Sequence, residues 1–189
     1  MGSEGTTAVV LCGGAARRFG ADKTRALLGD SSLLERVVGG LPAAWPVLCV
    51  GPERPLGRDV QWVREDPPGG GPVAALAAAL PLVTTPLVVV LGGDMPYAAG
   101  PAPGLVARLG ADHDADAVAA RDGDGRTQPL LAAYRVLALR DALPEAPAGT
   151  PLMRLLDALR VEVVDARWPL TLDVDTPADL EEARHRLEP

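Results

Sequence analysis

Residues 7–12 read TAVVLC, and residues 13–23, which follow at once, read GGAARRFGADK. The first run is short, apolar and rich in β-branched residues, so it predicts a buried strand. The second run joins paired glycines to several cations, and glycines let backbone N–H groups come close to an anion. In open parallel sheets, ligands bind beyond the carboxyl ends of the strands. This stretch therefore predicts a strand of a parallel sheet with a ligand-binding loop at its end.

Segments typical of strands and helices alternate outward from this stretch. Ser32 and Glu35 have the spacing of a capping box before an apolar helical face. Asp122–Gly125 is a turn-forming run, so the segments on either side of it predict a hairpin. The expected strands are 7–12, 46–50, 60–64, 87–91, 115–120, 129–134 and 161–165, and the expected helices are 32–41, 72–80, 150–159 and one that begins at Thr176. The proline-rich run 101–103 is interpreted as part of a loop.

Alternation of this kind is typical of an α/β fold with three layers, in which helices cover both faces of a mostly parallel sheet. The hairpin would add one antiparallel strand. We expect a single domain over residues 6–189, because 189 residues suit one domain and no linker separates two cores.

The composition excludes several classes of partner. The formal net charge is −7, and its long-range field would repel nucleic acid and anionic membranes. No apolar run approaches the ~20 residues of a membrane span, and the first residues do not form a signal-peptide pattern. Cys12 and Cys49 fall in short apolar runs, which predicts reduced cysteines in the core. We expect a cytoplasmic protein without nucleic-acid or membrane partners.

Residues 17–25 carry a net positive charge, opposite in sign to the net charge of the whole chain. Four cations lie within nine residues, against the single acid Asp22: Arg17, Arg18, Lys23 and Arg25. Such a reversal in an acidic chain indicates a site for phosphates.

Two common phosphate motifs are excluded by counting. A P-loop needs lysine directly after its second glycine, where this chain has Ala21, and the dinucleotide fingerprint needs glycine where it has Ala15.

Residues 11–23, LCGGAARRFGADK, resemble the signature loop of molybdenum cofactor guanylyltransferases, a MobA-like nucleotidyltransferase family. The usual form of that loop is L-A-G-G-x-S-x-R-M-G-x-D-K. This chain departs from it with Cys12 for alanine, Ala16 for serine and Phe19 for methionine. The change at Ala16 removes a hydroxyl that could bond a phosphate or the backbone.

Four further motifs of the family follow in the same order. Asp66 with residues 69–76, GGGPVAAL, resembles the second loop, and residues 92–96, GGDMP, resemble the C-D-M-P metal loop with Gly93 at the cysteine position. Residues 128–130, QPL, with Tyr134 resemble the segment that faces the acceptor. Residues 173–180, DVDTPADL, resemble the closing D-x-D-T-P-E-D-L stretch. Five motifs in one order make a chance resemblance improbable.

The resemblance implies a Rossmann-like nucleotidyltransferase fold and a magnesium-dependent reaction. GMP would pass from Mg-GTP to the terminal phosphate of molybdopterin, with release of pyrophosphate. GTP and molybdopterin would be the binding partners, with transient contacts to proteins that deliver or accept the cofactor.

The resemblance also implies roles for particular residues. The nucleotide-binding set is Leu11, Cys12, Gly13, Gly14, Lys23, Asp66 and Asp94. Catalysis would fall to Lys23, Arg18, Asp94 and Asp175, and the metal to Asp94 and Asp175. The position of Asp94 supports its role independently, because it follows the run LVVVLGG and so stands just past a strand end, and Mg²⁺ prefers carboxylate oxygens. We expect Asp173 and Asp175 to point to opposite faces, so that only Asp175 faces the site.

Several alternatives remain open at this stage. A cytidylyltransferase that uses CTP shares the signature loop, and Gly51 and Pro52 stand where relatives often carry a polar contact to the base. A sugar-1-phosphate nucleotidyltransferase shares the fold but usually has a longer chain. A non-catalytic nucleotide-binding regulatory protein would fit the substitutions at Ala16, Gly51 and Gly93.

Overall fold

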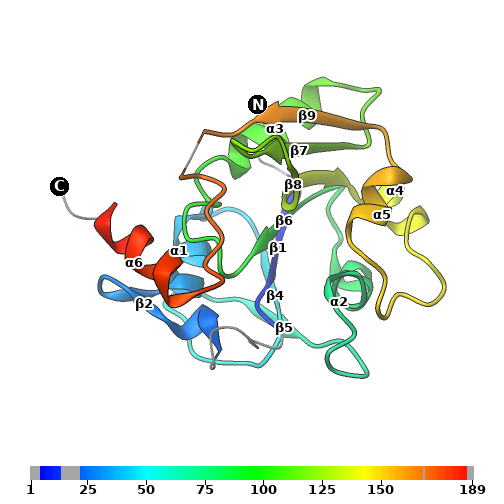
Figure 1. Cartoon of the computed structure of the whole chain (residues 1–189). Helices are drawn as coiled ribbons and strands as arrows, with labels where there is room; N and C mark the ends of the chain where they lie inside the picture. The colour runs from blue at the N-terminus through cyan, green and yellow to red at the C-terminus, as the bar shows by residue number, and fades with distance from the viewer. Residues whose placement is uncertain (1–4, 14–21, 168, 187–189) are drawn as a thin grey trace.

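The computed structural model describes residues 5–13, 22–167 and 169–186, and in this part of the chain the main sheet has seven strands (Figure 1). Their order across the sheet is β5-β4-β1-β6-β8-β7-β9. The strands are β1 Thr6–Leu11, β4 Val47–Val50, β5 Gln61–Val63, β6 Leu87–Gly92, β7 Ala117–Arg121, β8 Thr127–Arg135 and β9 Val161–Asp165. Only β8 runs antiparallel to its neighbours among these strands, which confirms the mostly parallel sheet with one antiparallel strand.

Helices cover both faces of this sheet (Figure 1). Helices α1 (Leu33–Gly40) and α3 (Ala102–Ala111) pack on one face, and α2 (Pro72–Ala79), α4 (Val136–Asp141) and α5 (Met153–Asp157) pack on the other. Helix α6 (Pro177–His185) packs beside α1 and the small hairpin of β2 (Leu27–Leu28) and β3 (Ser31–Ser32). Two short 3-10 turns, η1 (Lys23–Arg25) and η2 (Leu80–Leu82), complete the elements. The three-layer α/β/α arrangement is therefore confirmed.

The alternation of side chains in β1 explains why the sheet has two apolar cores. Ala8, Val10 and Cys12 belong to the core beneath α1 and α3, whereas Val9 and Leu11 belong to the core beneath α2. Successive side chains of a strand point to opposite faces, so a strand covered on both faces must be apolar throughout. The central strand β6 follows the same pattern with an unbroken run of buried residues after Leu87.

Helix α3 contradicts one expectation. The proline-rich run 101–103 was interpreted as a loop, but Pro101 is the N-cap of α3 and the next two residues form its first turn. Proline is tolerated there because the first N–H groups of a helix have no partner within the helix. The expected helix 150–159 also shrinks to α5, whose N-cap is Leu152 rather than Thr150. Within the described residues, no helix has the length and apolar character needed to cross a membrane.

Candidate functional site

The carboxyl ends of β4, β1 and β6 lie side by side at one edge of the sheet. The N–H of Gly93 donates to the carbonyl of Leu11 at 2.9 Å, and the N–H of Cys12 donates to the carbonyl of Val50 at 2.9 Å. These bonds extend the sheet by one residue past the strands. The loop that begins at Gly13 and the loop that carries Asp94 therefore leave the sheet next to each other.

Gly51 is explained by this close approach of the strand ends. Its φ of +151° lies in the region that favours glycine, and a Cβ there would stand 2.9 Å from the backbone nitrogen of Gly13. A side chain at position 51 would therefore push the start of the loop away. Glycine at this position has a packing reason, apart from any loss of a base contact.

Lys23 joins three carboxylates at this edge. Its Nζ lies 2.7 Å from Oδ2 of Asp94, 2.5 Å from Oδ1 of Asp175 and 3.6 Å from Oδ1 of Asp173. The Lys23 and Asp94 side chains are only 20% and 18% exposed. Burial acts to lower the pKa of Lys23, but the negative charges of Asp94 and Asp175 outweigh it and hold the pKa above its usual range. Lys23 is therefore an ammonium throughout the physiological range.

The segment that carries Asp173 and Asp175 is attached to the loop of Asp94. The N–H of Val174 donates to the carbonyl of Asp94 at 3.1 Å, and the Val174 side chain is fully buried against α6. Asp179 then accepts the N–H of Asp175 at 3.0 Å, as part of the capping box at the start of α6. Asp175 is thus placed by backbone bonds on both sides.

The expectation that Asp173 and Asp175 point to opposite faces was wrong, because both reach Lys23. Residues i and i+2 of an extended segment share a face, and Val174 between them takes the other. Partial burial and the charge of Asp94 raise the pKa of Asp173 to about 7, although Lys23 acts in the opposite direction. Sequence reasoning therefore missed Asp173 as a member of the cluster.

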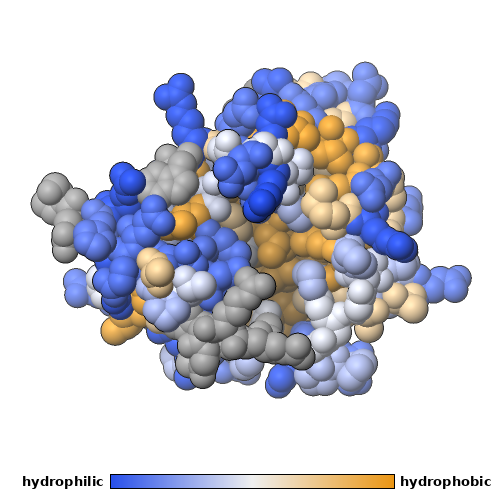
Figure 2. Space-filling model, viewed as in Figure 1, coloured by the Kyte–Doolittle hydropathy of each residue, from blue (hydrophilic) through white to orange (hydrophobic). Residues whose placement is uncertain are grey.

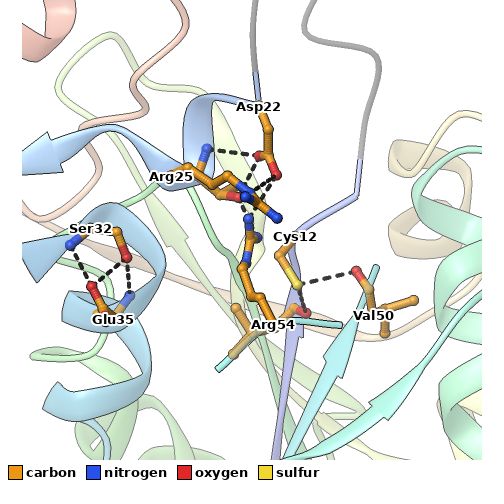
Figure 3. A network of polar contacts seen from close by, with 9 residues as sticks. Cys12, Asp22, Arg25, Ser32, Glu35, Val50 and Arg54 are labelled. Atoms are coloured by element: carbon orange, nitrogen blue, oxygen red, sulfur yellow. Dashed lines mark hydrogen bonds and ion pairs between the residues drawn. The ribbon is translucent and has the colours of Figure 1, made fainter. Parts of the chain in front are cut away.

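A second polar network lies beside Lys23 (Figure 3). Asp22 is the N-cap of η1, and its Oδ1 accepts the N–H of Thr24 at 3.1 Å and the hydroxyl of Thr24 at 2.6 Å. Arg54, from the loop after β4, donates to Oδ2 of Asp22 at 2.7 Å and to the hydroxyl of Thr24 at 2.5 Å. Arg54 was not among the predicted residues. Its place four residues past the end of β4 was the available signal, since ligands bind where parallel strands end.

The carboxylates suit a hard divalent cation. Mg²⁺ prefers oxygen ligands and is usually bound by one or two carboxylates together with waters and substrate phosphates. Asp94 and Asp175 supply two such carboxylates within bonding distance of one ammonium. Within the described residues, no group of three acidic, histidine or cysteine side chains is arranged as a ready metal cage. The donor set therefore fits a metal that arrives with phosphates.

The other predicted residues have different surroundings. Leu11 and Cys12 are buried, so only their backbone could meet a nucleotide, and Gly13 is exposed at the end of β1. Asp66 is exposed in the loop after β5, and none of the contacts among the described residues joins it to Lys23 or Asp94. Gly14 and Arg18, like Arg17 and Ala16, lie outside the described residues. The structure thus unites Lys23, Asp94 and Asp175 and leaves Asp66 apart.

The segment with the QPL motif borders the same edge. In β8 the register with β7 shifts between Ala119 and Ala120, so that Ala119 pairs with Ala132 but Ala120 pairs with Gln128. The residues between them form a bulge, and the fully buried Tyr134 donates its hydroxyl to the carbonyl of Pro129 at 2.8 Å. Tyr134 therefore supports this segment from beneath.

The face that holds these strand ends has a divided surface (Figure 2). Apolar residues gather at the middle of the view, over the place where β1 and β6 stand in Figure 1, and hydrophilic residues border them.

Comparison with known proteins identifies the relatives of this chain. Over residues 8–163 it matches the family described as MobA-like NTP transferase domain. A "Probable molybdenum cofactor guanylyltransferase" of Mycobacterium tuberculosis H37Rv is 37% identical, with 91% of this chain and 90% of the relative covered. A protein of the same name from Natronomonas pharaonis is 31% identical, with 96% and 98% covered.

Solved structures share the fold. "Molybdopterin-guanine dinucleotide biosynthesis protein A" of Archaeoglobus fulgidus superposes with a TM-score of 0.72 at 22% identity, with 96% of this chain and 98% of that chain covered. A Mycobacterium tuberculosis H37Rv protein, crystallised in complex with manganese, superposes with a TM-score of 0.69 at 20% identity, with 96% and 98% covered. The family match covers most of the chain, and the curated relatives extend over nearly all of it. This protein is a nucleotidyltransferase and belongs to the family of MobA-like NTP transferase domains.

Proposed function

We propose that this protein transfers GMP from Mg-GTP to the terminal phosphate of molybdopterin and releases pyrophosphate. The observation that carries the proposal is Lys23, held among Asp94, Asp175 and Asp173 where β1 and β6 end. The names of the curated relatives support guanine as the base and molybdenum cofactor as the acceptor.

The reaction needs positioning and charge neutralisation rather than a covalent enzyme intermediate. A terminal phosphate oxygen of molybdopterin forms a bond to the α-phosphorus of GTP, and the bond from that phosphorus to the α–β bridging oxygen breaks. The electron pair leaves with pyrophosphate. Lys23 is the mobile donor for the phosphates, and Gly13 offers a backbone N–H at the end of β1.

Asp94 and Asp175 would hold Mg²⁺, which neutralises phosphate charge when bound. The same two carboxylates bond to Lys23. With Mg-GTP bound, these carboxylates would hold the cation, and the ammonium of Lys23 would donate to the phosphates.

Two of the three substitutions that would fit a non-catalytic regulatory protein have a packing explanation. At Gly51 a Cβ would stand 2.9 Å from the backbone nitrogen of Gly13, and at Gly93 a Cβ would make a tight contact of 3.1 Å with Cβ of Cys12, so both glycines relieve crowding between neighbouring strand ends. Lys23, Asp94 and Asp175 retain the functional groups that transfer requires.

The test is turnover with defined substrates. The purified protein is incubated with molybdopterin, with or without molybdate, and with Mg²⁺ and each of the four nucleoside triphosphates in turn. We expect pyrophosphate and the guanine dinucleotide with GTP, and a loss of at least ~100-fold in Lys23→Ala, the scale set by removing one key charge-stabilising donor. Arg25→Ala is the matched control, because Arg25 is a neighbouring cation with a 63% exposed side chain. Product with CTP but not with GTP would mean that the base is cytosine and not guanine. Activity of Lys23→Ala near wild type would reject the role of Lys23.

A further inference from the structure

One buried arginine connects the loop after β4 to the turn that carries Lys23. We propose that Arg54 is a positioning residue for the nucleotidyl transfer, which sets the place of Lys23 by clamping Asp22 and Thr24 on either side of it. This inference rests on the proposed function of Lys23 as the phosphate donor. Neither the relatives' names nor the family match assigns a role to Arg54.

The contacts of Arg54 are directed at the two neighbours of Lys23. Nη1 donates to Oδ2 of Asp22 at 2.7 Å, and Nη2 donates to the hydroxyl of Thr24 at 2.5 Å. A guanidinium is planar and its donors form a rigid fork, so two simultaneous bonds fix the relative position of the two acceptors. The residue between those acceptors is Lys23.

Asp22 passes this constraint to the backbone of η1. Its Oδ1 accepts the N–H of Thr24, while its carbonyl accepts the N–H of Arg25 at 3.0 Å. A turn of three residues has few bonds of its own, so the cap decides its geometry. Without Arg54, Oδ2 of Asp22 would keep only the 3.5 Å contact with the exposed Arg25 among the described residues.

The burial of Arg54 indicates that this clamp has a purpose beyond a surface ion pair. Its side chain is only 9% exposed, and its Nε is buried with no hydrogen-bond partner among the described residues. Burying a charged group with an unmade hydrogen bond is unfavourable. Such groups are found preferentially at functional sites, where geometry is needed at a cost in stability.

Arg54 also lies near the end of β1 (Figure 3). The pKa of Cys12 is lowered, first by a hydrogen bond with Cys49 and also by the charge of Arg54. One guanidinium therefore stands close to Cys12, where β1 ends, and bonds to Asp22, where η1 begins. This arrangement ties the position of Lys23 to the sheet edge that carries Asp94.

Arg58 provides the matched control. Its guanidinium donates to the carbonyls of Val38, Leu41, Pro42, Ala43 and Trp45, so it joins the end of α1 to the segment before β4. It has no bond to the turn of Lys23 among the described contacts. Arg58→Ala should therefore lower the thermal stability and leave the kinetics with nucleotide within a few-fold of wild type.

The test compares Michaelis constants in Arg54→Ala, Arg54→Lys and Arg58→Ala. In Arg54→Ala we expect kcat/KM for the nucleotide to fall by about 10–100-fold, the scale of a small misplacement of a catalytic group, mainly through KM for Mg-GTP. KM for molybdopterin should stay within a few-fold of wild type. Arg54→Lys, which can reach only one acceptor at a time, should recover part of the loss. If the base proves to be cytosine, the same comparison is made with CTP.

A double-mutant cycle with Asp22→Asn isolates the route of the effect. Asparagine keeps the oxygen that accepts from Thr24 but loses the charge that faces Arg54. If Arg54 acts through Asp22, the double variant should be no worse than the worse single variant. Additive losses, or an unchanged nucleotide KM in Arg54→Ala, would overturn the inference.

Hydrogen exchange supplies a readout that needs no substrate. The N–H groups of Arg25 and Ala26 donate to the carbonyls of Asp22 and Lys23. Their hydrogen exchange should therefore be faster than wild type in Arg54→Ala and equal to wild type in Arg58→Ala. A wild-type protein without transferase activity would refute the proposed function, and the exchange result would still decide whether Arg54 orders this turn. Unchanged exchange in Arg54→Ala would reject the clamp itself.

Discussion

Cys12 and Gly93 stand opposite each other at the ends of β1 and β6. A Cβ added at Gly93 would lie 3.1 Å from Cβ of Cys12 and 3.2 Å from the carbonyl oxygen of Leu11. The family pattern has alanine at the first position and cysteine at the second, whereas this chain has cysteine and glycine. The thiol of Cys12 points away from Gly93, because its Sγ lies 3.3 Å from the carbonyl oxygen of Val50 on the side of β4. The contact near Gly93 is therefore made by Cβ of residue 12, which alanine and cysteine share.

Gly93→Cys gives the prediction at the residue scale. A Cβ at position 93 would lie 3.1 Å from Cβ of Cys12, tighter than ordinary van der Waals contact, and overpacking of this kind costs about 1–3 kcal/mol. Cys12→Ala keeps that Cβ, so adding it to Gly93→Cys should not restore the free energy of unfolding. Urea unfolding of the wild type, the two single variants and the double variant measures this, and a double variant more stable than Gly93→Cys would contradict the prediction.

At the scale of elements, the hairpin of β7 and β8 contains the feature that sequence reasoning could not foresee. The strands and the turn at Asp122–Gly125 follow from alternation and turn chemistry, and the structure has both. The bulge at Pro129–Leu131 depends on how β8 pairs with β7, where the register shifts between Ala119 and Ala120. The bond from the Tyr134 hydroxyl to the carbonyl of Pro129 then lies within the bulged strand. Local patterns contain no information about such a shift in pairing.

The same distinction separates the other successes from the failures. The capping box at Ser32 and the helix start at Thr176 were predicted because all their partners lie within four residues. Helix α3 was missed because prolines at its N-cap and in its first turn have the composition of a loop, and its apolar face became recognisable only against the sheet. Arg54 was missed because its partners lie about 30 residues earlier in the chain.

Tyr134→Phe tests the bulge. The substitution keeps the buried ring and removes the hydrogen bond to the half-buried Pro129, so it should cost the net value of one hydrogen bond, about 0.5–1.5 kcal/mol. Because Leu131 pairs with Leu91 near the end of β6, the bulge lies toward the site, and KM for molybdopterin should rise more than KM for GTP. Urea unfolding and steady-state kinetics measure the two effects.

Tyr97→Phe is the matched control for this substitution. Its hydroxyl also donates to a carbonyl, that of Ala183 at 3.0 Å, but Tyr97 is only half-buried. Water can replace the lost bond, so the change in stability should be smaller than in Tyr134→Phe. Equal losses in the two variants would mean that the buried bond beneath the bulge has no special importance.

At the scale of the whole molecule, a segment far along the chain from β1 and β6 supplies one of the carboxylates of the site. The family match ends at residue 163, yet Asp175 bonds to Lys23 from the segment that leads into α6. This segment reaches the site because Val174 is buried with Leu180 and Ala183, and because Asp179, the N3 residue of the capping box at the start of the helix, accepts the N–H of Asp175. The packing of helix α6 thus places the carboxylate of Asp175 at the edge of the sheet.

Asp179→Ala tests whether helix α6 places Asp175 without contributing to the stability of the sheet. Thr176 remains as the N-cap, but the variant loses the N3 half of the capping box and the bond of 3.0 Å that the N–H of Asp175 donates to Asp179. Because Asp175 is a proposed metal ligand, the Mg²⁺ concentration for half-maximal turnover should rise several-fold, while unfolding of the sheet changes little. Glu181→Ala removes an exposed acid two residues further along the same helix, whose pair with Arg184 is worth only a few tenths of a kcal/mol. Equal Mg²⁺ dependence in Asp179→Ala and Glu181→Ala would show that α6 does not place Asp175. A shift confined to Asp179→Ala would connect the last helix of the described chain directly to the metal.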